Sequence, residues 1–225
     1  MTHMPSADSY RIARESLKEQ AWEILRDLIV RGVIAPGQKL TERDVAKLLG
    51  VGRMPARDAL MKLEEQGLVV TKRDARYVIE LSQKDIEDWF EIRQALEILA
   101  VQDAVVRRGA EDCDQLRHAL QSMRSAVTQR DAETYVQSDL EIHELIWSMS
   151  HNRHLISMLH TMIGPIFVLI SSQMNIQHDW DAVFQLHSAL VDKICLGDAP
   201  AAIEAMQQHN ADSLAWSLTA FKERP

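Results

Sequence analysis

The stretch from Lys39 to Val70 constrains the fold more than any other part of this 225-residue chain. Its first half carries a short helical pattern that Thr41 can cap, with Asp44 three positions later completing a capping box. Gly50 is placed to end that helix, because glycine readily adopts the left-handed conformation needed there. A second helical pattern starts near Pro55, which suits the first helical position. Two short helices joined by a glycine-containing turn predict a helix-turn-helix.

Charged side chains on the second helix indicate what this element contacts. Arg53 and Arg57 are four residues apart near its start and therefore share one face. A recognition helix presents this region to base edges and phosphates, so DNA binding is predicted. The alternative interpretation is that both arginines are simply solvated. The apolar residues expected to face the core are Val45, Leu48 and Leu49 in the first helix, and Ala56, Leu60, Met61, Leu63 and Leu68 in the second.

The flanking segments extend the helix-turn-helix into a winged helix. An amphipathic helix is predicted from Arg14 to Arg31, and VIAPG forms a turn that leads into Lys39. Two strand-like pieces within residues 69–81 surround the polar tip TKRDAR, which predicts a β-hairpin. Further basic residues are expected to extend the face of Arg53 and Arg57, namely Arg43 on the preceding helix and Lys72, Arg73 and Arg76 at the hairpin tip.

From Ser82 onward the sequence shows only helical periodicity. The residues SQKD can cap a long helix that runs to about Arg108, and its expected inner face is Ile86, Phe90, Ile92, Leu96, Leu99 and Ala100. Further helices are predicted at residues 112–129, 132–149, 153–173, 180–196 and 199–221. The expected fold class is therefore mainly α. A winged helix-turn-helix domain over residues 1–81 is followed by an all-α six-helix bundle over residues 82–225.

The distribution of charge explains how an acidic chain can bind DNA. The formal net charge is −8, which by itself is unfavourable for a nucleic-acid partner. Residues 1–81 carry 14 basic and 12 acidic residues, whereas residues 82–225 carry 11 and 21. The acidic part would repel phosphates, so DNA contact is expected in the N-terminal part only.

The cysteine content and the apolar runs limit which classes of protein are possible. Cys113 and Cys195 are far apart and form no CxxC pattern, which argues against a disulfide framework and a cysteine-based zinc site. The longest apolar run, Met162 to Ile170, falls well short of the roughly 20 residues that cross a bilayer. A cytoplasmic protein without membrane association is expected.

One set of polar residues in the bundle has the pattern of a metal site. Asp139 and His143 are four residues apart on one predicted helix, so both can point inward. His187 and His209 lie on the next-to-last and last helices, each 11 residues from Asp198 in the connecting turn. Antiparallel neighbours with a short loop bring such positions to the same height. Three imidazoles and a carboxylate suit a divalent ion such as Zn²⁺ or Ni²⁺, although an Asp-x-x-x-His pair more often marks a solvated face.

The sequence from Gly32 to Val70, GVIAPGQKLTERDVAKLLGVGRMPARDALMKLEEQGLVV, resembles the GntR family of bacterial transcription regulators. The resemblance implies that Arg43, Arg53 and Arg57 contact DNA, together with Arg73 in the wing. The chain departs from the family pattern at Gly52, Met54, Ala56 and Asp58, and the hairpin tip lacks the usual glycine. Two hydroxyl groups that could contact phosphate or bases are thereby lost, so a different operator preference is expected.

The helical part resembles the FCD effector-binding domain of the FadR-like subfamily, through EIRQALE, DLEIH, LHSAL and MQQH. In metal-binding members an Asp, a His four residues later and one His on each of the last two main helices hold a divalent ion. Asp139, His143, His187 and His209 match all four. Arg93 matches an arginine that can meet the carboxylate of an effector. Its alternative role is a structural ion pair with Glu97 on the same helix.

Together these features predict a regulator that is not an enzyme. Two copies would form a homodimer through the bundles and bind a palindromic operator in double-stranded DNA. A small carboxylic acid would complete the metal site, pair with Arg93 and change operator affinity. Three alternatives remain open: a purely structural metal, a metal-dependent hydrolase, and a bundle that senses acyl chains without metal.

Overall fold

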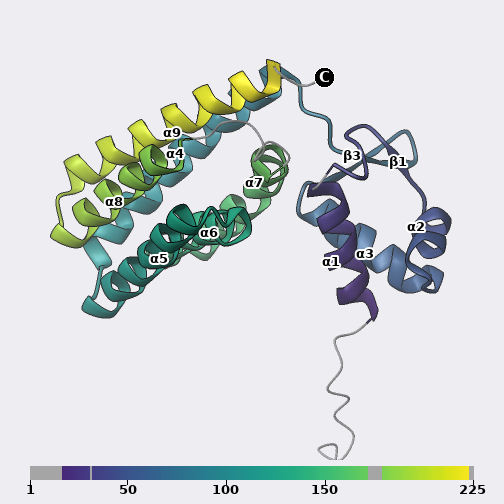
Figure 1. The fold of residues 1–225 in the computed structure, drawn as a ribbon, viewed down its shortest axis with the longest axis horizontal. Coiled ribbons are helices and arrows are strands. Elements are labelled where there is room, and N and C mark those ends of the chain that lie inside the picture. Colours follow the sequence, from purple (N-terminus) through teal and green to yellow (C-terminus); the bar gives the residue numbers. More distant parts are fainter. Residues whose placement is uncertain (1–16, 31, 172–178, 223–225) are drawn as a thin grey trace, which may run out of the picture.

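The computed structural model describes residues 17–30, 32–171 and 179–222. Figure 1 shows two groups of elements, a smaller N-terminal group and a larger group of helices that follows it. The smaller group contains α1 (Leu17–Val30), α2 (Glu42–Leu49) and α3 (Arg53–Glu65). Residues 14–16 and 31 of the expected first helix lie outside the described residues. The mainly α fold with an N-terminal winged helix-turn-helix is confirmed.

A small antiparallel sheet completes the N-terminal group. Its strands are β1 (Lys39–Leu40), β2 (Val69–Lys72) and β3 (Ala75–Val78), in the order β1-β3-β2. The predicted hairpin is confirmed, with Val69 opposite Val78 and Lys72 opposite Ala75. Both residues of its tight turn, Arg73 and Asp74, have positive φ, as a two-residue hairpin of type I′ requires. The short strand β1 was not predicted, because two residues cannot show an alternating pattern.

The capping residues of the helix-turn-helix behave largely as predicted. The Thr41 hydroxyl accepts a hydrogen bond from the Asp44 backbone N–H, and Gly50 ends α2 in the left-handed conformation. The expected start of the second helix at Pro55 is wrong, since α3 begins at Arg53 after Gly52. Pro55 is thus the third helical residue. It is tolerated there because the first N–H groups of a helix have no intrahelical partner.

Two predicted core residues in this part face solvent instead. Leu48 is 58% exposed and Met61 is 41% exposed. Met61 follows the buried Leu60 and so lies about 100° further around α3, away from the core. The small Ala59, which was not predicted, is buried in its place. The remaining core of this group includes Leu25, Ile29 and Leu63.

The larger group is the expected all-helical bundle. Its helices are α4 (Gln83–Arg107), α5 (Ala110–Gln129), α6 (Ala132–Met149), α7 (Arg153–Ser171), α8 (Trp180–Leu196) and α9 (Ala199–Lys222). Residues 172 and 173 of the predicted fourth bundle helix lie outside the described residues. Ser82 caps α4 in a reciprocal capping box with Asp85. Helix α4 packs against α9, α6 and α7, and α5 packs against α6 and α8.

The predicted inner face of α4 needs correction. Ile92 and Leu99 are 54% and 43% exposed, whereas Arg93 and Glu97 are buried. The prediction selected apolar residues and therefore passed over a buried ion pair on the true inner face.

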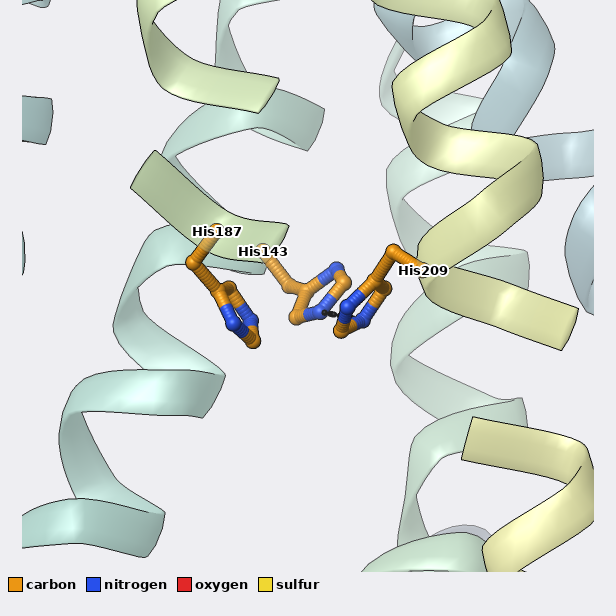
Figure 2. Close-up of side chains that lie close together, drawn as sticks. All are labelled: His143, His187 and His209. Carbon is orange, nitrogen blue, oxygen red and sulfur yellow. Dashed lines mark hydrogen bonds between the residues drawn. The ribbon is translucent and has the colours of Figure 1, made fainter. Parts of the chain in front are cut away.

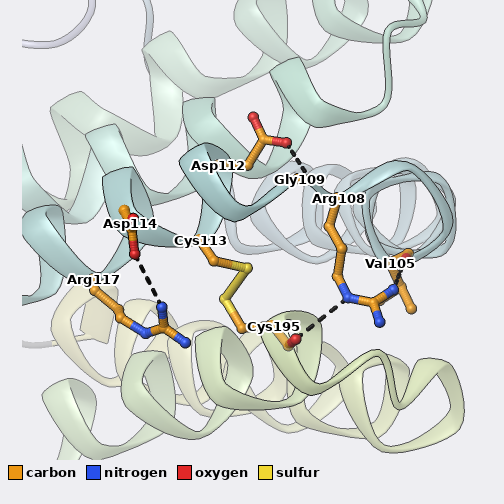
Figure 3. The surroundings of a disulfide bond; sticks show 8 residues. All are labelled: Val105, Arg108, Gly109, Asp112, Cys113, Asp114, Arg117 and Cys195. Atoms are coloured by element: carbon orange, nitrogen blue, oxygen red, sulfur yellow. Dashed lines mark hydrogen bonds and ion pairs between the residues drawn. A yellow bond between two sulfur atoms is a disulfide. The ribbon is translucent and has the colours of Figure 1, made fainter.

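Helices α5 and α8 are joined by a disulfide between Cys113 and Cys195 (Figure 3). The sequence argued against a disulfide framework, and this single link was not predicted. They are 82 residues apart in sequence, but the packing of α5 on α8 brings their Cα atoms to 5.7 Å, a normal spacing for a disulfide. Among the described helices, none combines the length and hydrophobicity needed to span a membrane.

Candidate metal centre and nucleic-acid face

Three histidines from different helices meet inside the bundle (Figure 2). His143 belongs to α6, His187 to α8 and His209 to α9, and each is at most 2% exposed. Each offers one ring nitrogen within 4.8 Å of the others, a grouping that can hold a metal ion. The predicted equal heights of His187 and His209 on neighbouring helices are borne out by their ring contact, with centroids 4.4 Å apart.

The hydrogen-bonding capacity of these rings fits a cation at their centre. His187 Nδ1 donates to the Val183 carbonyl at 2.9 Å, so in the neutral ring its Nε2 bears a lone pair. That lone pair faces the Asp139 carboxylate at 3.0 Å, which is also an acceptor when ionised. His143 Nε2 and His209 Nε2 are likewise 3.0 Å apart, about the separation of two nitrogens that ligate one Zn²⁺. A bound cation would satisfy the facing lone pairs of His187 and Asp139.

The protonation states also suit metal binding. Burial, assisted by the nearby His187 and His143, holds the pKa of His209 well below its usual value, which favours the neutral ring that can ligate. Burial would raise the pKa of Asp139, but the contact with His187 and the positive charge of His187, His143 and Arg93 together outweigh this and lower the pKa to about 2. The structure therefore brings all four predicted residues together, with Asp139 at the edge of the three-histidine cluster.

A second carboxylate supports the site and was not predicted as a site residue. Glu97 is fully buried, with Oε1 3.0 Å from His143 Nδ1 and Oε2 3.1 Å from Arg93 Nε. Burial alone would raise the pKa of Glu97, but the Arg93 guanidinium and His143 keep it well below its usual range. Such carboxylate–histidine contacts orient metal ligands in many proteins. The i, i+4 spacing of Arg93 and Glu97 was the available signal, and it was interpreted only as an ion pair.

A small cavity of about 60 Å³ adjoins the histidines. Its walls include Arg93, Asp139 and His209, together with Tyr135, Ser213 and Trp216. Arg93 therefore has both predicted placements: it forms an ion pair with Glu97, and it also lines the cavity.

The basic residues of the helix-turn-helix lie on the surface. The Arg43 side chain is 82% exposed, and Arg53, Arg57 and Arg73 are also exposed. Arg76 differs from them. Its guanidinium contacts Glu64 at 3.1 Å and Glu42 at 3.7 Å, so it fastens β3 to α3 and α2.

Comparisons with known proteins match both parts of the chain. A family model described as "Bacterial regulatory proteins, gntR family" matches residues 17–79, and an FCD domain model matches residues 88–212, more than half of the chain. The Bacillus subtilis protein "Uncharacterized HTH-type transcriptional regulator YdhC" is 27% identical over 91% of this chain and 93% of its own length. The gluconate operon transcriptional repressor of B. subtilis is 26% identical over 84% of this chain and 79% of its own. Among solved structures, Escherichia coli McbR/YncC has the same fold, with a TM-score of 0.78, 19% identity and coverage of 92% of this chain and 100% of that one.

Proposed function

Since this chain is a transcriptional regulator of the gntR family with an FCD domain, and not an enzyme, we propose that a small organic acid and a divalent metal ion in its helical part control its affinity for operator DNA. The observation that carries the proposal is that His209 of the three-histidine cluster, Asp139 and Arg93 line one cavity. The N-terminal part, residues 1–81, would bind DNA. Residues 82–225 would bind the metal and the acid and form the dimer.

The metal would be held by His143, His187, His209 and Asp139. Imidazole nitrogens with one carboxylate suit Zn²⁺ or Ni²⁺ better than Mg²⁺ or Ca²⁺, which prefer oxygen. When bound, the ion would attract an oxygen of an anionic ligand as a Lewis acid. The buried neutral state of His209 and the ionised state of Asp139 support this assignment.

The effector is a small carboxylic acid. Arg93 supplies a guanidinium that can pair with a carboxylate, Ser213 supplies a hydroxyl, and Trp216 supplies an apolar wall. The cavity favours a compact molecule and gives little room for an acyl chain. A relative named for the gluconate operon is consistent with an acid of this size.

The DNA contacts would come from Arg43, Arg53 and Arg57, with Arg73 reaching the duplex from the hairpin tip. All four are exposed, and those on α3 lie in its first turn and a half. Met54, which is 64% exposed between them, would present an apolar surface to the bases. A palindromic operator follows if two copies bind together, with half-sites about one helical turn apart.

The outer face of α4 supports a homodimer. Ile92, Leu99 and Val106 are 54%, 43% and 80% exposed, and the exposed Ala95 and Gln102 lie between them. Because these five residues are spaced three and four positions apart, they form one continuous strip along α4, opposite its buried face. This strip is called the seam below. An antiparallel second copy centred on Leu99 would place Ile92 against Val106. The acidic first turn of α4, which contains Asp85, would then lie near the basic last turn of α4 in the second copy, which contains Arg107. In such an isologous interface the same pair of contacts forms twice.

Two measurements test the proposal. Thermal unfolding of the purified protein would be followed with a panel of small carboxylic acids, with and without added Zn²⁺ or Ni²⁺. An acid that raises the unfolding temperature only when metal is present, and that changes affinity for operator fragments selected with the wild type, is the expected result. A purely structural metal predicts a different outcome, in which removing it lowers the unfolding temperature and no acid has any effect.

The DNA assignment is tested by replacing Arg53 and Arg57 together with alanine. Each lost contact is worth about 1–3 kcal/mol, so affinity for the selected operator should fall by about 30-fold or more. Arg117→Ala, which removes an exposed arginine on α5, is the matched control and should leave binding unchanged. Equal operator affinity of the double variant and wild type would overturn the assignment.

A further inference from the structure

We infer that Arg93 and the metal ion compete for one lone pair on His143, and that Glu97 positions both residues for this exchange. The inference rests on the metal set proposed above and adds a regulatory role for the buried Arg93–Glu97 pair. Metal loading would then release part of the Arg93 guanidinium toward the cavity.

The first step is to locate the proton on His143. Its Nδ1 lies 3.0 Å from Glu97 Oε1, and an ionised carboxylate can only accept a hydrogen bond. The negative charge at this distance favours the tautomer with the proton on Nδ1, and in that tautomer the neutral ring has a single lone pair on Nε2.

The second step is to identify what that lone pair faces. Arg93 Nη2 lies 3.3 Å from His143 Nε2, and a guanidinium can only donate. His209 Nε2 lies 3.0 Å from the same atom and is itself a proposed ligand of the ion. One lone pair cannot serve both an Arg93 N–H and a metal ion, so the two are mutually exclusive partners of His143.

The third step concerns where Arg93 goes when the ion binds. Its Nε lies 3.1 Å from Glu97 Oε2, and this ion pair would be kept because it does not involve the lone pair of His143. The released Nη2 would turn into the cavity that Arg93 already lines. A carboxylate in the cavity would then find both the ion and a free guanidinium nitrogen. Metal and acid should therefore strengthen each other's binding.

Variants of the pair should change metal affinity in opposite directions. Glu97→Gln removes the charge that orients His143 and should weaken Zn²⁺ binding about 10- to 100-fold, the usual effect of losing such support. Arg93→Lys keeps a positive charge beside Glu97 but lacks the second nitrogen that reaches His143. It should tighten Zn²⁺ binding by about 3- to 10-fold, because one competing hydrogen bond is lost.

The experiment measures the dissociation constant of Zn²⁺ by competition with a chromophoric chelator, using the full chain. Asp103→Asn is the matched control, because it breaks another i, i+4 pair on α4, with Arg107, away from the cluster. It should bind Zn²⁺ as the wild type does. Thermal unfolding of each variant establishes that it is folded. If Glu97→Gln does not fold, Glu97→Asp replaces it, and weaker binding is again expected.

A merely structural ion pair predicts the same direction for both variants, since each would loosen the site. Equal or weaker Zn²⁺ binding by Arg93→Lys would overturn the competition, and unchanged binding by Glu97→Gln or its substitute would overturn the positioning role. If the wild type itself fails to bind Zn²⁺, the proposed metal centre fails and takes this inference with it. If the wild type binds and the variants match it, only the inference fails.

Discussion

Among single residues, His187 gives the most direct test of the metal centre. Its side chain is fully buried, and its Nδ1 is already occupied by the Val183 carbonyl, so Nε2 is the nitrogen available to an ion. His187→Ala should therefore lose bound metal, measured by elemental analysis after dialysis against metal-free buffer. His118→Ala, which changes an exposed histidine on α5, is the control and should retain it. Full metal occupancy in the His187 variant would remove this residue from the ligand set.

The four proposed ligands could be recognised in the sequence because their positions are related by spacing along one helix or by equal distance from one turn. Asp139 and His143 share a helix, and His187 and His209 are equally distant from one turn. The role of Glu97 could not be recognised in the same way. Its contact with His143 joins residues 46 positions apart on different helices, and nothing in a single sequence reports such a contact.

At the scale of elements, the wing is held to the helix-turn-helix by Glu64. Its carboxylate accepts from the Thr71 hydroxyl at 2.6 Å and contacts Arg76 at 3.1 Å. The hydrogen bond from Thr71, helped by Arg76 and opposed by burial, lowers the pKa of Glu64. A carboxyl group whose pKa is lower in the folded state adds stability at pH values above its unfolded pKa, about 4.5, and this contribution is lost as the pH falls.

Glu64→Gln should consequently destabilise the protein at pH 7, by less than about 1 kcal/mol because the site is partly solvated. The difference from wild type should shrink as the pH falls below about 4.5. Urea unfolding at a series of pH values measures it, with the exposed neighbour Glu65→Gln as control. A difference that stays constant across this range would show that the charge of Glu64 does not contribute.

The disulfide between α5 and α8 provides a second test at this scale. It closes a loop with a sequence separation of 82 residues, and such links typically add about 2–4 kcal/mol of stability. Reduction with dithiothreitol should lower the unfolding temperature of the wild type. Cys195→Ser should unfold at the lower temperature with or without reductant. If reductant leaves the wild type unchanged, the link does not stabilise the bundle.

The boundaries of the bundle helices were predictable, whereas strand β1, the start of α3 and the inner face of α4 were not. The bundle helices are bounded by residues with strong local preferences, such as Ser82, Asp131 and Gly197. By contrast, β1 exists only because β3 pairs with it, and α4 turns Arg93 and Glu97 inward because partners on other helices satisfy them. Tertiary contacts decide these features, and local patterns do not contain them.

At the scale of the whole molecule, the seam on α4 predicts how operator binding depends on assembly. Leu99 lies at its centre, so Leu99→Glu would place two carboxylates face to face across the two-fold axis and oppose pairing. Sedimentation velocity should show a dimer for wild type and a monomer for this variant. Val33→Glu, which changes an exposed apolar residue in the N-terminal group outside α4, is the control and should remain dimeric. A monomer binds only one half-site. In a dimer the first bound subunit holds the second one close to its half-site, and the variant loses this effect, so its operator affinity should fall steeply. A Leu99→Glu variant that stays dimeric would place the interface on another surface.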